Sequence, residues 1–180
     1  TPSVTGSYLS GQEAMQELRT DDAARYFRDA ASAQWDNPIV VERAFMAYAA
    51  DGQIDAAATA AQHLLELDPT NEMARLVVAT AALKQRRYEA AEADLDKLGA
   101  DSFEGITGAL LKAWAYTGEG KLADGFKLLD QVGQGGLEQF LAFHRAIMAD
   151  VAGDQADAIK YAAEAYDADP YVARVVEAYA

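Results

Sequence analysis

The two histidines, His63 and His144, are the residues best suited to metal binding or acid–base catalysis near neutral pH. They lie far apart in the sequence, and neither has a second histidine three or four positions away. Two histidines three or four positions apart would place two metal ligands on one face of a helix. No metal site or histidine-based catalytic pair is therefore indicated, although His144 could line a binding groove.

Three other stretches have the outline of a functional motif, and each has a simpler interpretation. GEGKLA (118–123) resembles a dinucleotide-binding glycine loop, but a helical pattern precedes it where that motif requires a strand. The acidic positions of 89–96 lie on the outer side of a predicted helix and indicate a solvated face. KQRR (84–87), which could grip an acidic partner, is interpreted as a turn. We expect no catalytic residue, cofactor or bound metal.

Composition excludes further classes of function. The 180-residue chain has a formal net charge of −14, which does not suit phosphate neutralisation on nucleic acid or an anionic membrane surface. It has no cysteine, so disulfides and thiolate chemistry are excluded. No apolar run approaches the roughly 18 residues of a membrane-spanning helix, so we expect neither nucleic-acid binding nor membrane insertion.

The dominant pattern is a repeat with a period of 34 or 33 residues. Its best copy is DGQIDAAATAAQHLLELDP (51–69). A small residue marks the same position in each copy, and a second position recurs twelve residues earlier. The first series is Ala23, Ala57, Ala91, Gly125 and Ala158, and the second is Gly11, Phe45, Ala79, Ala113 and Ala146. Both halves of each repeat have i, i+3, i+4, i+7 apolar spacing, which predicts two amphipathic helices.

This pattern resembles the tetratricopeptide repeat (TPR) family of bacterial type over nearly the whole chain. Matches to the family pattern include Gly11, Tyr48, Tyr116, the marker alanines, Phe27, Pro69 and Pro170. The resemblance implies an all-α fold, an α-solenoid of stacked antiparallel helix pairs in a right-handed superhelix. Phe45 and Gly125 depart from the pattern, and the third and fourth repeats lack the closing proline. We therefore expect looser junctions near 99–103 and 133–136.

The expected organisation is one solenoid over residues 1–180, with five repeats and the first helix of a sixth. The repeats cover about 4–36, 38–70, 71–104, 105–137 and 138–170, and the partial one covers 171–180. The partial repeat would carry an apolar stripe that faces a neighbouring helix not included in residues 1–180. The stripe consists of Val172, Val175, Val176 and Tyr179. The chain is thus expected to be the N-terminal fragment of a longer repeat protein; alternatively, 171–180 form a short cap or a dimer contact.

In the resembling family the first helix of each repeat lines a groove that receives peptides or helices. In that register the candidate partner-binding residues are Tyr8, Gln12, Met15, Arg43, Met46, Met73, Thr80, Trp114, Phe143 and His144. The lysines and asparagines with which some TPR co-chaperones clamp a C-terminal carboxylate are replaced by Ile39, Glu42 and Met46. We therefore expect an apolar helix or extended segment as the ligand.

The predicted function is a non-catalytic scaffold for protein–protein interaction, in bacterial envelope assembly or secretion by resemblance. An extracytoplasmic location is favoured over a cytoplasmic one. Two alternatives stay open: a regulatory or docking segment of a larger enzyme, and a module that forms homo-oligomers through its repeat ends.

Overall fold

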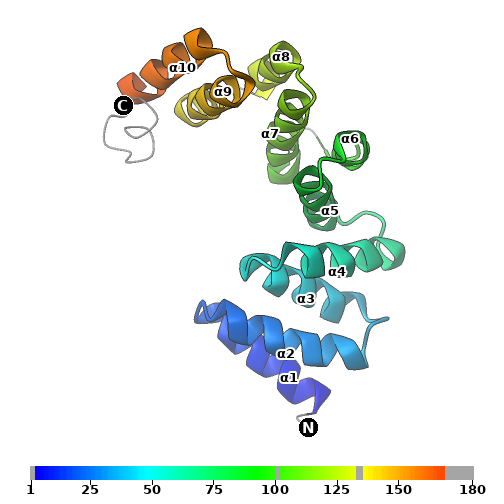
Figure 1. The fold of residues 1–180 in the computed structure, drawn as a ribbon. Helices are drawn as coiled ribbons and strands as arrows, with labels where there is room; N and C mark the ends of the chain where they lie inside the picture. Colours follow the sequence, from blue (N-terminus) through cyan, green and yellow to red (C-terminus); the bar gives the residue numbers. More distant parts are fainter. Residues whose placement is uncertain (1–2, 100–101, 133–135, 169–180) are drawn as a thin grey trace. The chain divides into compact units, whose positions relative to one another are not determined.

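The computed structural model describes residues 3–99, 102–132 and 136–168, which form ten α-helices and no β-strand (Figure 1). The helices are α1 (Val4–Gln16), α2 (Thr20–Ala33), α3 (Pro38–Ala50), α4 (Ile54–Leu67), α5 (Glu72–Lys84), α6 (Tyr88–Leu95), α7 (Phe103–Gly118), α8 (Leu122–Val132), α9 (Glu138–Ala152) and α10 (Gln155–Ala168). Each odd-numbered helix packs on the helix that follows it. The predicted all-α solenoid of helix pairs is confirmed.

The chain divides into two compact bodies, an N-terminal body (Thr1–Leu98) and a C-terminal body (Gly99–Ala180). In the N-terminal body, α2 packs on α3 and α4 packs on α5, so each pair is joined to the next through its second helix. In the C-terminal body, α9 packs against both α7 and α8. Helix stacking therefore continues from pair to pair within each body.

The turn inside every helix pair has the same backbone geometry. One residue of each turn has a positive φ, and the next residue donates its N–H to the carbonyl five positions back. This is the Schellman arrangement that closes a helix C-terminus. The positive-φ residues are Leu18, Gly52, Arg86, Gly120 and Gly153, spaced at the period of the repeat. Glycine takes this conformation without steric strain, whereas leucine and arginine do not.

The two helices of a pair begin differently. Ser3, Asn37, Asn71 and Ser102 each accept a hydrogen bond from a backbone N–H in the first turn of α1, α3, α5 and α7. By contrast, α2, α4 and α6 begin directly after the turn with no side-chain cap. In the first three pairs the first helix is thus capped by a side chain, and the start of the second helix is fixed by the turn. The last pair reverses this, because α9 has no side-chain cap and Asp154 accepts a hydrogen bond from the Asp157 N–H in the first turn of α10.

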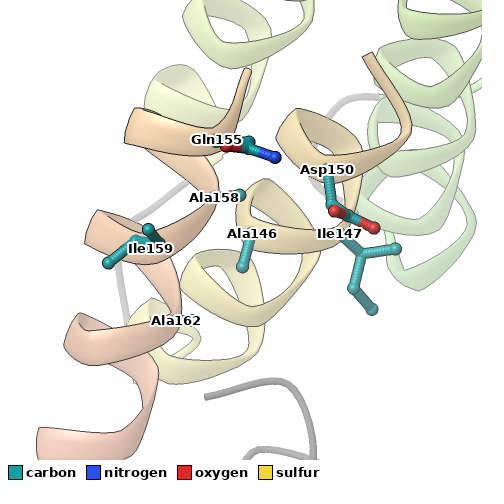
Figure 2. Close-up of a pocket in the computed structure, with 7 residues that line it drawn as sticks. All are labelled: Ala146, Ile147, Asp150, Gln155, Ala158, Ile159 and Ala162. Carbon is teal, nitrogen blue, oxygen red and sulfur yellow. The ribbon is translucent and has the colours of Figure 1, made fainter. Parts of the chain in front are cut away.

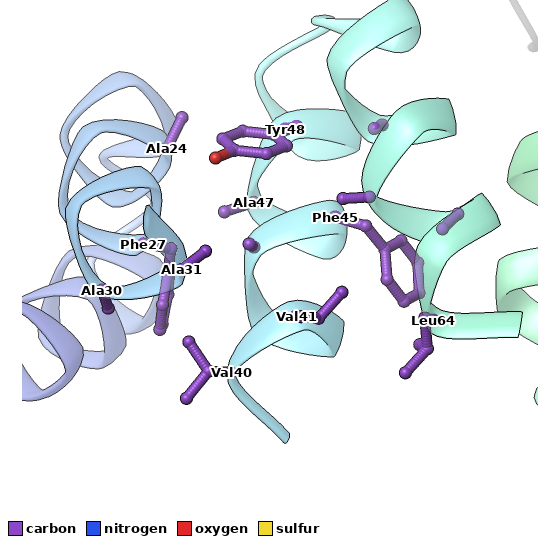
Figure 3. Packing of buried hydrophobic residues seen from close by; sticks show 14 of the residues in the cluster. Ala24, Phe27, Ala30, Ala31, Val40, Val41, Phe45, Ala47, Tyr48 and Leu64 are labelled. Carbon is purple, nitrogen blue, oxygen red and sulfur yellow. The ribbon is translucent and has the colours of Figure 1, made fainter. Parts of the chain in front are cut away.

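Large side chains fill the N-terminal body between small ones. Phe27, Phe45 and Leu64 are almost completely buried. Figure 3 shows Val40 of α3 beside the alanines of α2, with Phe45 on the opposite side of α3 turned toward Leu64. α3 and α5 are therefore covered on two sides, each by its own partner and by the preceding pair.

Gly125 lies where α8 approaches α7 closely. A β-carbon at this position would lie 2.9 Å from the backbone carbonyl oxygen of Ala113 and 3.1 Å from the Cε of Met148. The glycine that replaces a marker alanine thus brings α8 closer to α7 than an alanine would allow.

The predicted looser junctions fall partly outside the described residues, at 100–101 and 133–135. At the first of them, α6 has only eight residues and the boundary between the two bodies follows it at Leu98. The predictions for 169–180, including the partial sixth repeat, also lie outside the described residues.

Leu18→Gly and Arg86→Gly are expected to raise the free energy of unfolding by about 0.5–1 kcal/mol each. Relief of the left-handed strain, about 1–2 kcal/mol, exceeds the entropic cost of glycine. Both side chains are exposed, so little packing is lost. Urea unfolding measures the effect. Leu18→Ala, which keeps a β-carbon, is the control and should not stabilise the chain.

Gly125→Ala is expected to destabilise the chain by about 1–2 kcal/mol, although alanine has the higher helix propensity. The β-carbon meets a backbone carbonyl that cannot move without shifting α7. Lys127→Ala, at an exposed position of the same helix, is the control. A Gly125→Ala chain as stable as the parent in urea would show that the helices separate without cost.

Candidate functional site

The first helices of the N-terminal body border a small pocket. It has a volume of about 200 Å³ and is lined by Gln12, Met15 and Gln16 of α1, Phe27 of α2, and Arg43 and Met46 of α3. Four of these residues, Gln12, Met15, Arg43 and Met46, are candidates predicted from the sequence. The structure therefore brings them together at one place.

The floor of the pocket is apolar and rigid. Phe27 is fully buried and packs edge-on against Tyr8, with ring centroids 5.6 Å apart. The Tyr8 hydroxyl accepts a hydrogen bond from the Gln12 side chain at 3.3 Å. Tyr8 therefore supports the pocket from behind and does not line it. Met46, 36% exposed, supplies a flexible apolar wall that can adapt to different side chains.

Arg43 gives the pocket a cationic edge. Its side chain is exposed, and it has no hydrogen bond or ion pair within the described part of the chain. The pocket thus combines an apolar floor, two amide side chains and a guanidinium whose five N–H donors are available to a ligand. An apolar side chain with an acceptor group beside it fits this arrangement.

The two candidates on α5 do not belong to this pocket. Met73 is half-buried and packs against the core of the N-terminal body. The Thr80 hydroxyl donates to the backbone carbonyl of Leu76 at 2.7 Å within its own helix. Neither side chain contributes to the group formed by Met15 and Met46.

The remaining candidates, Trp114, Phe143 and His144, lie together in the C-terminal body. The indole N–H of Trp114 donates to Nδ1 of His144 at 3.3 Å, and the two rings are perpendicular. The His144 ring also packs edge-on against Phe143 and against Phe140, with centroids 5.8 Å and 4.5 Å away. Phe140 is 47% exposed and was not among the predicted residues. It lies one helical turn before His144, and that spacing could have indicated it.

Burial lowers the pKa of His144 below its ordinary value. The hydrogen bond from Trp114 also favours the neutral ring of His144, because Nδ1 can accept it only when that nitrogen carries no proton. The aromatic cluster thus holds a neutral imidazole. No group of three or more histidine, aspartate or glutamate side chains in the described residues could hold a metal ion.

His63 has a structural contact that the sequence did not reveal. Its ring stacks on Trp35 with centroids 4.6 Å apart, and its nitrogens lie 3.0 Å from the carbonyl oxygen of Trp35 and 3.1 Å from Glu66. It therefore ties α4 to the segment that follows α2.

Among the described helices, none combines the length and the apolar character that a membrane span needs.

Together the helix pairs, their turns and the small residues at the crossings define the tetratricopeptide-repeat fold, as the sequence predicted. A structure of MamA from Desulfovibrio magneticus RS-1 is similar to this chain, with a TM-score of 0.76 at 19% identity over 94% of this chain and 97% of that one. A further MamA structure matches with a TM-score of 0.73 at 15% identity, covering 93% and 92%. A thermophilic TPR protein of Thermus thermophilus matches with a TM-score of 0.71 at 15% identity, covering 98% and 97%. No protein-family model matches the sequence, and no curated protein matches it either.

The free energy of unfolding is expected to decrease as the pH falls below about 6.5, the ordinary pKa of histidine. In the unfolded chain His144 takes up a proton there, whereas in the folded chain burial keeps it neutral, so acid favours the unfolded state. Urea unfolding between pH 8 and 5.5 measures this. The comparison is with His144→Gln, whose free energy of unfolding should fall less steeply with falling pH, by the equivalent of up to about one proton. Equal slopes for both chains would contradict the prediction.

Proposed function

We propose that this chain is a non-catalytic scaffold that binds another protein through the pocket between α1 and α3. The observation that carries the proposal is the convergence of Gln12, Met15, Arg43 and Met46 on one pocket over a rigid floor. Helices hold these side chains in place, so little order has to be created on binding. The similar solved structures support the fold on which the proposal is built.

The partner segment that fits is an apolar helix or extended stretch that inserts one side chain between Met15 and Met46. Methionine walls adapt to apolar side chains of different shapes. Arg43, at the edge, favours a carboxylate or free backbone carbonyl beside that side chain, because a guanidinium donates to both. A role in bacterial envelope assembly or secretion remains part of the proposal, on the family resemblance alone.

Met15→Ala together with Met46→Ala is expected to reduce partner recovery in affinity capture by about tenfold or more. Buried apolar anchors carry most of the binding free energy at such interfaces. Leu67→Ala is the matched control, because Leu67 is 38% exposed on α4, a second helix, and does not line the pocket. Circular dichroism should show unchanged helicity in all variants. Full recovery with the methionine double variant would place the binding surface elsewhere.

A further inference from the structure

Four aromatic side chains gather on the first helices of the C-terminal body, and the function proposed above does not use them. Trp114 comes from α7, and Phe140, Phe143 and His144 come from α9. The rings of Trp114, Phe140 and Phe143 each meet the His144 ring at a steep angle, so that His144 is the centre of the cluster. Phe140 is 47% exposed, and the cluster therefore reaches the surface.

The repeat fold does not require aromatic rings at three of these positions. Counted by the repeat, Phe140 and His144 correspond to Ile39 and Arg43 of α3. None of the positions of α1, α3 and α5 that correspond to Phe140, His144 and Trp114 holds a ring, and these helices pack into their pairs all the same. The aromatic cluster is thus an addition to the repeat.

The cluster is also separate from the largest pocket in the described residues. That pocket lies between α9 and α10 and has a volume of about 480 Å³, and Figure 2 shows the side chains that surround it. Ala162, which has the repeat position of Phe27, is one of them. None of the four rings lines this pocket. The cluster therefore presents a surface of its own.

Hydrogen bonding determines what His144 can offer to a ligand. Its Nδ1 accepts the indole N–H of Trp114 at 3.3 Å, so the proton of the neutral ring lies on Nε2. Nε2 has no hydrogen-bond partner within the described part of the chain. It is not one of the buried unpartnered side-chain atoms there, so solvent reaches it. The cluster thus presents one N–H donor beside the exposed ring of Phe140.

The side chains of the cluster offer neither an acceptor nor a charge. The indole and both phenylalanines lack an acceptor, and Nδ1 of His144 is already occupied. Ile147, the next residue on this side of α9, is apolar, and the neighbouring Arg145 is bound to Asp130 of α8 at 2.7 Å. A charged side chain placed on these rings would lose its hydration without compensation, and so would a backbone N–H.

Proline meets both of these conditions. Its ring is apolar, and it has no backbone N–H that needs an acceptor. In an extended polyproline II segment the carbonyl groups are free to accept a hydrogen bond, whereas most carbonyls of a helix are bonded within the helix. Segments of this kind are bound by grooves lined with aromatic side chains.

We propose that the aromatic cluster of Trp114, Phe140, Phe143 and His144 binds a proline-containing extended segment of another protein. A proline ring packs on Phe140, and a backbone carbonyl beside it accepts the N–H of His144 Nε2. Trp114 is a positioning residue, because its N–H holds the imidazole in the form that donates from Nε2. The proposal does not depend on the pocket between α1 and α3, which lies in the other body.

Titration of the full chain with a capped hexaproline peptide near neutral pH, followed by the indole N–H signal of Trp114 in nuclear magnetic resonance spectra, tests the proposal. The peptide is expected to bind about tenfold more tightly than capped hexaalanine, whose N–H groups find no acceptor. Phe140→Ala and His144→Phe are each expected to weaken binding by about fivefold, the second because it keeps a ring and removes the donor. Leu67→Ala, an exposed apolar position of the other body, is the control.

Absence of binding, equal affinity for the two peptides, or unchanged affinity in either cluster variant would overturn the proposal. The chain with Met15→Ala and Met46→Ala should bind hexaproline as the parent does. The two binding surfaces can therefore fail or succeed separately.

The side-chain nitrogens of His144 give a second readout, which a ring with only a packing role would not move. Nitrogen resonance spectra of the parent chain near neutral pH should show a protonated Nε2 and an unprotonated Nδ1, and hexaproline should shift the Nε2 signal. Loss of these signals in His144→Phe identifies them. A protonated Nδ1, or an Nε2 signal that hexaproline leaves unchanged, would contradict the proposed hydrogen bond.

Discussion

The close crossing of helices within each pair is the constraint on which the rest of this structure depends. Ala23, Ala57 and Ala91 are completely buried at the same repeat position. At Gly125 the approach is closer still. Because the backbones approach closely here, the pair has little room for large side chains beside these positions.

Where the large residues lie determines where pockets form. Phe27 fills the space inside the first pair and leaves only a small depression, whose walls come from Met15 of its own pair and Met46 of the next. In the last described pair, Ala162 stands in place of Phe27, and the depression becomes a pocket more than twice as large. One repeated backbone thus presents surfaces of different size and chemistry through changes at a few positions.

Much of the fold could be predicted from the sequence, because the repeat period and the small marker residues directly report the helix crossings. The candidate residues of α1 and α3 that converge on one pocket came from the family register rather than from any chemical signature. Phe140 and the contact between Trp35 and His63 were not found. Phe140 lies in the first turn of α9, where the repeat has no marker, and the aromatic stack joins residues 28 positions apart through an irregular segment. Leu18 and Arg86 were also hidden, since their left-handed conformation follows from the shared turn and not from residue type.

Charge distinguishes the pocket of the N-terminal body from the rest of the surface. The chain has 29 acidic and 15 basic residues, so an arginine readily finds a carboxylate. Those that do so in the described residues are Arg19, Arg25, Arg75 and Arg145. Arg28 and Arg87 bond to glutamine side chains instead. Arg43, like Arg86, has neither kind of partner within the described part of the chain, but Arg43 borders the pocket, and it remains hydrated at little cost because it is exposed. A ligand acceptor that binds over the apolar floor replaces the water around Arg43. The guanidinium then orients the ligand as well as adding affinity, since its planar N–H donors fit an acceptor only from a limited range of directions.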